Sequence, residues 1–214
     1  MIYLAFDRLA RRLRRTPAPV EVARWMERAL DGLARAGVAG TIKHLPGHGR
    51  TSVDTHKALP TVSASAAELE WDIAPFRALN HAVIGMTGHL LFTAWDAENP
   101  ATLSAKVICE VIRGQIGFDG LLLTDDLDME ALGGPVPERA ARALAAGCDL
   151  ALNCWGRMDD MVGIATACPT MGEGAAARLA RALAGTRVST PDMARQGELV
   201  ATRDALLALL AQVA

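Results

Sequence analysis

Apolar positions along the chain follow two spacings, and the two alternate. Short continuous apolar runs predict four buried β-strands, at residues 38–45, 82–90, 120–126 and 148–154. Apolar residues at helical spacing predict helices at 20–36, from Ser65 towards Asn80, after Ser104, and at 137–146, 157–167, 174–184 and 191–212. Strands that alternate with helices predict βαβ units, and therefore an α/β fold with a parallel sheet and helices outside it.

Local signals place the ends of three of these helices. Gly37 follows the first predicted helix directly, and glycine is a common residue at a helix end. Ser65 and Glu68 have the spacing of a capping box, in which each side chain binds the backbone N–H of the other. Ser104 stands at the N-cap position of a helix whose apolar face is predicted to be Val107, Ile108, Val111 and Ile112.

Polar residues stand at the end of each predicted strand: Lys43 and His44, Thr87 to His89, Thr124 to Asp126, and Asn153. In a (β/α)8 barrel the reacting groups lie at the carboxyl ends of the strands, so these residues are expected in one site. Such a barrel has eight strands, and four are predicted here. Four strands instead of eight indicate that the chain is either part of such a barrel or a divergent remnant of one. Residues 1–214 would form one partial domain.

Composition narrows the class of protein. Of 214 residues 51% are hydrophobic and 21% charged, as in globular proteins, and the net charge of −2 favours neither nucleic acid nor an anionic membrane as a partner. No apolar run reaches the roughly 18 residues that a membrane span needs, and the first residues lack a secretory pattern. The four cysteines show no CxxC spacing, which predicts reduced thiols and a cytoplasmic protein. Residues 1–18 are a divergent, arginine-rich start that we interpret as a solvated helix face.

The segment KHLPGHGRTSVDTH, residues 43–56, holds three of the five histidines. His44, His48, Asp54 and His56 are residue types that bind zinc or iron, although their spacing matches no common motif. A phosphate-binding loop would need more glycine and a lysine at a fixed place, and a histidine here can also be purely structural. An acid/base role rests on Asp54 and His56, because residues i and i+2 of an extended loop point the same way. An aspartate beside an imidazole favours the protonated histidine, which can then give up a proton near neutral pH.

The third predicted strand ends in two adjacent aspartates. The two-residue period of a strand sends Asp125 and Asp126 to opposite sides. One carboxylate can therefore face the mouth of a barrel as a nucleophile or an electrostatic stabiliser. The other is expected to accept hydrogen bonds from nearby backbone, and a role in helix capping remains an alternative for either residue.

These motifs resemble one known family. KHLPGHGRTSVDTHKALP, MTGHLLF, PATLS, IRGQIGFDGLLLTDDLDMEAL and LAAGCDLALNCWG follow one another as in the glycoside hydrolase family 3 β-N-acetylglucosaminidases of bacterial cell-wall recycling, the NagZ type. The resemblance covers about residues 20–168. It implies an α/β fold of the TIM-barrel family, here the C-terminal half of the barrel, with about four βα units plus C-terminal helices. It also implies a β-N-acetylhexosaminidase, and retaining hydrolysis of terminal β-linked N-acetylglucosamine from muropeptides. It implies no cofactor or metal, and neither nucleic acid nor a membrane as a partner.

The resemblance also implies roles for individual residues. Asp125 matches the nucleophile and His56 the general acid/base, with Asp54 as the partner of His56. Lys43 and His44 match residues that bind sugar hydroxyls. A further substrate-binding residue of the family, an arginine, is matched approximately by Arg12 or its neighbour Arg11.

Family members are longer, and their first barrel strands precede the region of resemblance. The start of the chain is therefore expected to be that of a truncated or frameshifted gene product that lacks the N-terminal part. Two functions follow for such a chain. It is either an active exo-glycosidase, or an inactive remnant that binds sugar or depends on a partner. Exposed sheet edges would favour self-association.

Overall fold

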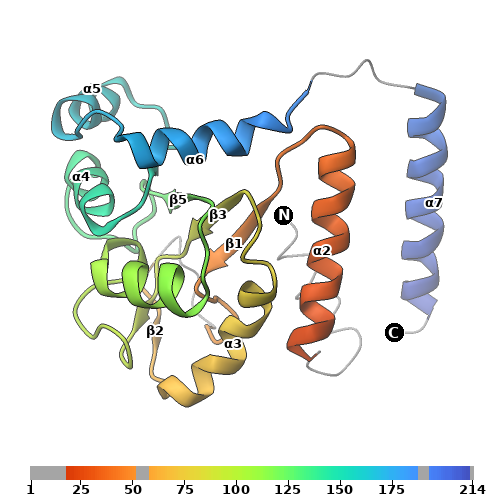
Figure 1. Ribbon diagram of the computed structural model, residues 1–214, viewed down its shortest axis with the longest axis horizontal. Helices are drawn as coiled ribbons and strands as arrows, with labels where there is room; N and C mark the ends of the chain where they lie inside the picture. Colours follow the sequence, from red (N-terminus) through yellow and green to blue (C-terminus); the bar gives the residue numbers. More distant parts are fainter. Residues whose placement is uncertain (1–17, 52–57, 188–192, 213–214) are drawn as a thin grey trace. The chain divides into compact units, whose positions relative to one another are not determined.

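The computed structural model describes residues 18–51, 58–187 and 193–212 (Figure 1). The chain divides into two compact units, residues 19–186 and the two ends, 1–18 with 187–214. The ends contribute one described helix, α7 (Met193–Gln212), which agrees with the helix predicted at 191–212. All described strands belong to the larger unit. One partial domain over 1–214 stays a prediction.

Four parallel strands form the main sheet of the larger unit, in the order β1-β3-β5-β6. They are β1 (Thr41–Leu45), β3 (Ile84–Thr87), β5 (Leu121–Asp126) and β6 (Leu150–Leu152). The four predicted strands and their parallel pairing are thus confirmed. Two strands of two residues each, β2 (Thr61–Val62) and β4 (Leu91–Phe92), pair in a separate parallel sheet and were not predicted. Two residues are too few to show the alternation that marks a strand.

Helices connect the strands close to where the sequence predicts them. They are α2 (Pro19–Arg35), α3 (Ala66–Ala78), η1 (Ala101–Leu103), η2 (Val107–Gln115), α4 (Val136–Ala146), α5 (Met158–Ala167) and α6 (Glu173–Ala184). Both bonds of the Ser65–Glu68 capping box are present, and Gly37 follows α2 at a φ of 75°. Oγ of Ser104 accepts the N–H of Val107 at 3.1 Å. η2 is a π-helix, which the apolar spacing did not distinguish from an α-helix.

One face of the main sheet is covered by helices. Ile42, Gly85 and Leu122 lie opposite one another across β1, β3 and β5. Ile42 and Leu122 belong to a buried core that includes Leu69 and Ile73 of α3, Ile108 and Ile112 of η2, and Ala140 and Ala143 of α4. The core therefore lies between this face of the sheet and the helices α3, η2 and α4 (Figure 1).

The other face of the main sheet, which we call the distal face, carries the alternate residues of each strand. Its half-buried residues are Lys43 of β1, Ile84 and Met86 of β3, Leu123 of β5, and Leu150 and Leu152 of β6. Leu121 of β5, which is paired with Ile84, lies on the same face and is buried. Lys43, Met86, Leu123 and Leu150 form one row, because each is paired with the next across the sheet. Asp125 follows Leu123 by two residues and therefore lies at the carboxyl end of the same face.

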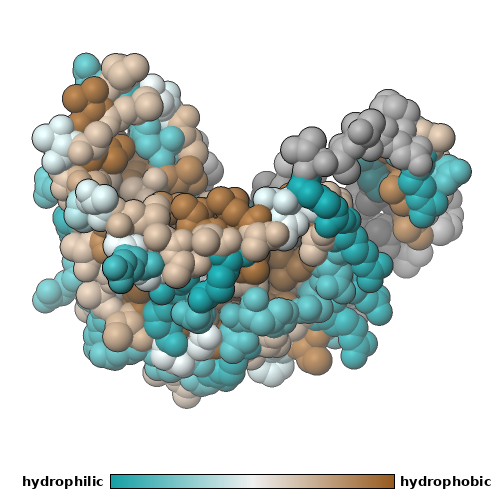
Figure 2. All heavy atoms as spheres, turned by 45° about the horizontal axis from the view of Figure 1, so that its top comes forward, coloured by the Kyte–Doolittle hydropathy of each residue, from teal (hydrophilic) through white to brown (hydrophobic). Residues whose placement is uncertain are grey.

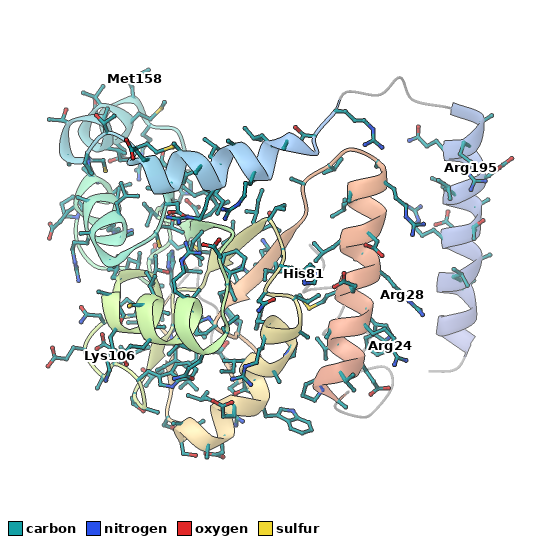
Figure 3. All side chains as sticks on the ribbon, in the orientation of Figure 1. Arg24, Arg28, His81, Lys106, Met158 and Arg195 are labelled. Atoms are coloured by element: carbon teal, nitrogen blue, oxygen red, sulfur yellow. The ribbon has the colours of Figure 1, made fainter. Side chains whose placement is uncertain are left out.

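Several large apolar side chains are exposed on the larger unit. Trp155, Met158, Met161 and Val162, in α5 and just before it, are all exposed, and we call them the α5 patch. Met158 is labelled at the outer end of α5 in Figure 3. Figure 2 shows hydrophobic side chains among hydrophilic ones on the face that it draws. No helix in the described part of the chain is long and apolar enough to cross a membrane.

A buried aspartate fastens α6 to the amino ends of the strands. Asp149 directly precedes β6, and its side chain is 3% exposed. It accepts two bonds from Arg178 of α6, at 2.6 and 2.9 Å, one from Arg113 of η2 at 3.0 Å, and one from the N–H of Leu122 at 2.9 Å. Burial raises the pKa of Asp149, but the bonds from Arg178 and Leu122 and the charge of Arg113 outweigh it and hold this pKa below its usual value.

Asp149→Asn is expected to lower the free energy of unfolding by about 3 kcal/mol, because it leaves the two arginines without their buried counter-charge. This loss is at the low end of what breaking a buried ion pair costs, because the side chains of Arg113 and Arg178 are 22% and 25% exposed. Asp119→Asn is the control. Its carboxylate is 78% exposed beside Arg181, so the cost is expected to be about 0.5 kcal/mol. Denaturant titration measures the free energy of unfolding of both variants. Equal losses of stability in the two would contradict the anchoring role of Asp149.

Candidate active site

Two residues of the predicted site meet at the carboxyl ends of β1 and β5. Nε2 of His44 lies 3.4 Å from Oδ2 of Asp125, and the two side chains are 16% and 15% exposed. The strand between them, β3, ends just before Gly88. A Cβ atom on residue 88 would lie 3.1 Å from Cβ of His44, so the missing side chain leaves room for the imidazole. The structure therefore brings together two groups that lie far apart in the sequence, at positions 44 and 125.

His44 is neutral at neutral pH. Burial lowers its pKa to about 4, and the charges of Lys43 and His48 act in the same direction, while Asp125 raises it. The imidazole that faces Asp125 therefore carries one N–H and one acceptor nitrogen rather than two N–H groups. Its Nδ1 is buried, and its Nε2 is the nitrogen directed at Asp125.

The two adjacent aspartates have different surroundings, as the strand period predicted. Oδ1 of Asp125 accepts the N–H of Asp126 at 2.9 Å, while its Oδ2 is the oxygen directed at His44. Oδ1 of Asp126 accepts the N–H groups of Asp128 at 3.2 Å and Cys154 at 3.1 Å. Asp126 thus organises backbone, and Asp125 is the carboxylate beside the histidine.

His89 supports this strand end from within the protein. It is fully buried, with Nδ1 2.8 Å from Oγ1 of Thr102 and Nε2 2.9 Å from the carbonyl oxygen of Asp126. Because a carbonyl oxygen only accepts, Nε2 carries the proton and donates it. The sequence identified His89 as a polar strand-end residue but gave it no role. The structure shows that it binds the backbone carbonyl of Asp126, the residue that follows Asp125.

Asp128 is a residue of the site region that sequence reasoning missed. Its side chain is fully buried, and Oδ2 accepts from Nδ2 of Asn153 and from the N–H groups of Cys154 and Trp155, at 2.9 to 3.0 Å. It therefore joins the loop after β5 to the loop after β6. The only signal in the sequence was a third acidic residue close behind a buried strand.

The opening segment of the predicted site is described in part. Lys43 lies on the distal face, paired with Met86, and peptide bonds 43–44 and 45–46 are cis. His48 lies with its ring centre 5.5 Å from that of His44, and its Nδ1 is 3.2 Å from Oγ1 of Thr51. Arg50 forms an ion pair with Asp72 of α3, which ties the loop to that helix.

Three residues of the predicted site, Arg12, Asp54 and His56, lie outside the described residues. The acid/base pair and the binding arginine therefore stay predictions. Within the described ranges, no group of three or more His, Cys, Asp or Glu side chains is arranged to hold a metal ion. Two of the four residues of the metal alternative, Asp54 and His56, lie outside these ranges.

The chain is similar to known proteins over most of its length. The family model described as "Glycosyl hydrolase family 3 N terminal domain" matches residues 17–185. A beta-hexosaminidase of Tolumonas auensis is 41% identical over 142 residues. A glycoside hydrolase family 3 beta-N-acetylglucosaminidase from Paenibacillus superposes with a TM-score of 0.69 at 35% identity. NagZ from Neisseria gonorrhoeae, in complex with N-trifluoroacetyl-D-glucosamine, superposes with a TM-score of 0.71 at 31% identity.

These matches cover much of this chain but only part of each relative. The Tolumonas match spans 64% of this chain and 42% of the relative. The Paenibacillus match spans 79% of this chain and 36% of the relative, and the Neisseria match spans 92% of this chain and 57% of the relative. The region of family 3 likeness coincides with the larger unit, residues 19–186, and includes both His44 and Asp125.

The lowered pKa of His44 predicts a pH dependence of stability. In the unfolded chain this histidine takes up a proton near pH 6.5, and in the folded protein only near pH 4. The unfolded state therefore binds more protons between these values, and the free energy of unfolding falls as the pH is lowered through this window. Burial also lowers the pKa of His48 and His89, which adds to the effect.

His44→Gln is expected to make this fall shallower, because glutamine does not titrate. His81→Gln is the matched control, since the side chain of His81 is 58% exposed beside Glu27 of α2 (Figure 3). Urea titrations from pH 4 to pH 7 measure the free energy of unfolding of both variants and of the unaltered protein. A His44→Gln curve parallel to that of the unaltered protein would show that His44 is not buried in the neutral form.

Proposed function

The chain belongs to glycosyl hydrolase family 3, and from this premise we propose that it is a retaining exo-glycosidase for terminal β-linked N-acetylglucosamine. The observation that carries the proposal is the contact between Asp125 and His44. It provides a carboxylate at a strand end, with one oxygen directed at a neutral histidine 3.4 Å away. Retaining glycosidases use such a carboxylate as a nucleophile.

In the proposed reaction a carboxylate oxygen of Asp125 attacks the anomeric carbon of the sugar. The bond to the leaving group breaks as His56 donates a proton to the departing oxygen, and the sugar stays attached to Asp125 as an ester. His56, now neutral, then takes a proton from a water molecule that attacks the same carbon. This second displacement releases the β-anomer and restores Asp125, with Asp54 orienting the imidazole in both steps.

Lys43 and His44 are proposed to bind the hydroxyl groups of the sugar, together with Arg12. The support for His44 is its place at the end of β1, with Nε2 3.4 Å from Oδ2 of the proposed nucleophile and a side chain that is 16% exposed. The support for Lys43 is its place on the distal face, which also carries Asp125 at its carboxyl end.

The substrate is proposed to be a muropeptide that carries N-acetylglucosamine, handled in the cytoplasm during cell-wall recycling. The Neisseria relative was solved with an N-acylated glucosamine, which favours an amino sugar over an unsubstituted hexose. No cofactor or metal takes part in the proposed scheme, because the carboxylate and the histidine supply the nucleophile and the proton.

The main sheet is proposed to be the C-terminal half of a TIM barrel, because its four parallel strands carry the site at their carboxyl ends. The chain spans 36% to 57% of the solved relatives named above, so an inactive remnant is the alternative. Such a remnant would bind sugar, or depend on a partner, without turnover. Catalysis needs groups held to within about 0.5 Å, and a half barrel requires further strands to achieve that.

Asp125→Ala is expected to abolish turnover of 4-nitrophenyl N-acetyl-β-glucosaminide, with a loss on the order of 10⁴-fold or more, because the ester intermediate can no longer form. The matched control is Asp119→Ala, an exposed aspartate two residues before β5 begins, at the opposite end of that strand. It is expected to keep full activity. NMR of the first product should show the β-anomer. Turnover of the unaltered chain no greater than that of Asp125→Ala would favour the inactive alternative.

His56→Ala is expected to lose about 10²- to 10⁴-fold in kcat/KM on a substrate whose leaving group is a sugar, because that group needs a proton to depart. The loss should be much smaller for a 4-nitrophenyl leaving group, which departs as a stable anion. The two substrates are compared on the same preparations, with His81→Ala as the control. Equal losses on both substrates would assign His56 a role other than proton donation.

A further inference from the structure

Each edge strand of the main sheet pairs on one side only. In the described part of the chain, β1 pairs with β3 and β6 pairs with β5, and no strand pairs with the outer side of either. Such edges present backbone N–H and C=O groups that can pair with another strand. All four strands run in the same direction, so β6 of one copy can pair in parallel with β1 of a second copy without reversal of either chain.

The distal face has the composition of a barrel interior. Met86, Leu123 and Leu150 form a continuous apolar row across three strands, with Lys43 in the same row on β1. The interior of a (β/α)8 barrel is filled by layers of mostly bulky apolar side chains, and each layer takes its side chains from alternate strands. Met86, Leu123 and Leu150 are side chains of this kind. The helices of the buried core pack against the opposite face, so that core does not cover this row.

We propose that two copies of the 214-residue chain associate into one closed barrel of eight parallel strands, four from each copy, in which β6 of each copy pairs with β1 of the other. The two-fold axis runs along the barrel axis, which makes the two new strand pairs identical, and closure leaves no free edge. The inference rests on the proposed function, because the family assigned there requires eight strands around its site.

A second copy fits these edges better than an unrelated strand for three reasons. The number of strands closes at eight, both edges are parallel, and each copy has a net charge of only −2, so the halves repel weakly. The arrangement also completes the site. Lys43 and His44 at the end of one copy's β1 would come beside the end of the other copy's β6, and both Asp125 carboxylates would line the same mouth.

Sedimentation equilibrium of the purified chain measures the mass without reference to turnover. We expect twice the 22.6 kDa of one chain. Hydrogen exchange followed by mass spectrometry then locates the interface. The amides of β1 and β6 are expected to exchange more slowly as the protein concentration rises and dimers form. A single-chain mass at every concentration would overturn the inference, as would an assembly larger than two chains. A dimer that protects only the α5 patch would overturn it as well.

Leu150→Lys places a charge in the apolar row beside the proposed interface and is expected to return the mass to that of one chain. Val162→Lys is the control, because Val162 is 58% exposed in α5, away from the row, and the dimer should persist. Circular dichroism shows whether each variant folds. If Leu150→Lys does not fold, the exchange protection of β1 and β6 in the unaltered protein decides the question.

The mass and the turnover separate this inference from the proposed function. A barrel dimer that does not turn over substrate would contradict the proposed function and support the interface. Turnover by a single chain would support the proposed function and contradict the need for the interface.

Discussion

The contact between His44 and Asp125 depends on the register of three parallel strands, because β1 and β5 do not pair with each other. Met86 of β3 pairs with Lys43 on one side and with Leu123 on the other. Neighbouring strands lie about 4.8 Å apart, so the two backbones are roughly 10 Å apart and both side chains must reach across the end of β3. A slip of one residue in β5 would turn Asp125 towards the helix-covered face. The apolar packing that sets this register therefore also sets the site.

Carboxylates at both ends of the sheet hold backbone in place and so define what remains for chemistry. Asp149 binds the N–H of Leu122 at the amino end, and Asp126 and Asp128 bind loop N–H groups at the carboxyl end. A buried carboxylate is stable when hydrogen bonds replace its water. Asp149 meets that requirement with both oxygens, and Asp128 meets it with Oδ2. Asp125 differs, because one of its oxygens is directed at a histidine side chain. Rigid neighbours around one accessible carboxylate are the arrangement that a nucleophile needs.

The sequence predicted the elements of the larger unit well, because each has a local cause. Gly37 ends a helix, the Ser65–Glu68 box begins one, and the apolar runs are long enough to mark all four strands of the main sheet. It did not predict β2 and β4, which have two residues each, or the π-helical form of η2. In the site, strand-end positions predicted that His44 and Asp125 would be neighbours. The roles of His89 and Asp128 arise from contacts with residues 13 to 37 positions away, and no local pattern encodes these.

The two faces of the main sheet serve different purposes. Folding of the larger unit relies on the helix-covered face, where Ile42 and Leu122 join the buried core. The candidate site instead lies at the end of the distal face, whose apolar row takes no part in that core. A chain with these four strands can therefore bury a stable core whether or not the distal face is covered. The catalysis that we propose depends on the distal face being covered, since an open face admits water and leaves the reacting groups without opposing walls. The separation of the two faces therefore allows the core and the family motifs to be present while the proposed activity depends on what packs against the row at Leu123.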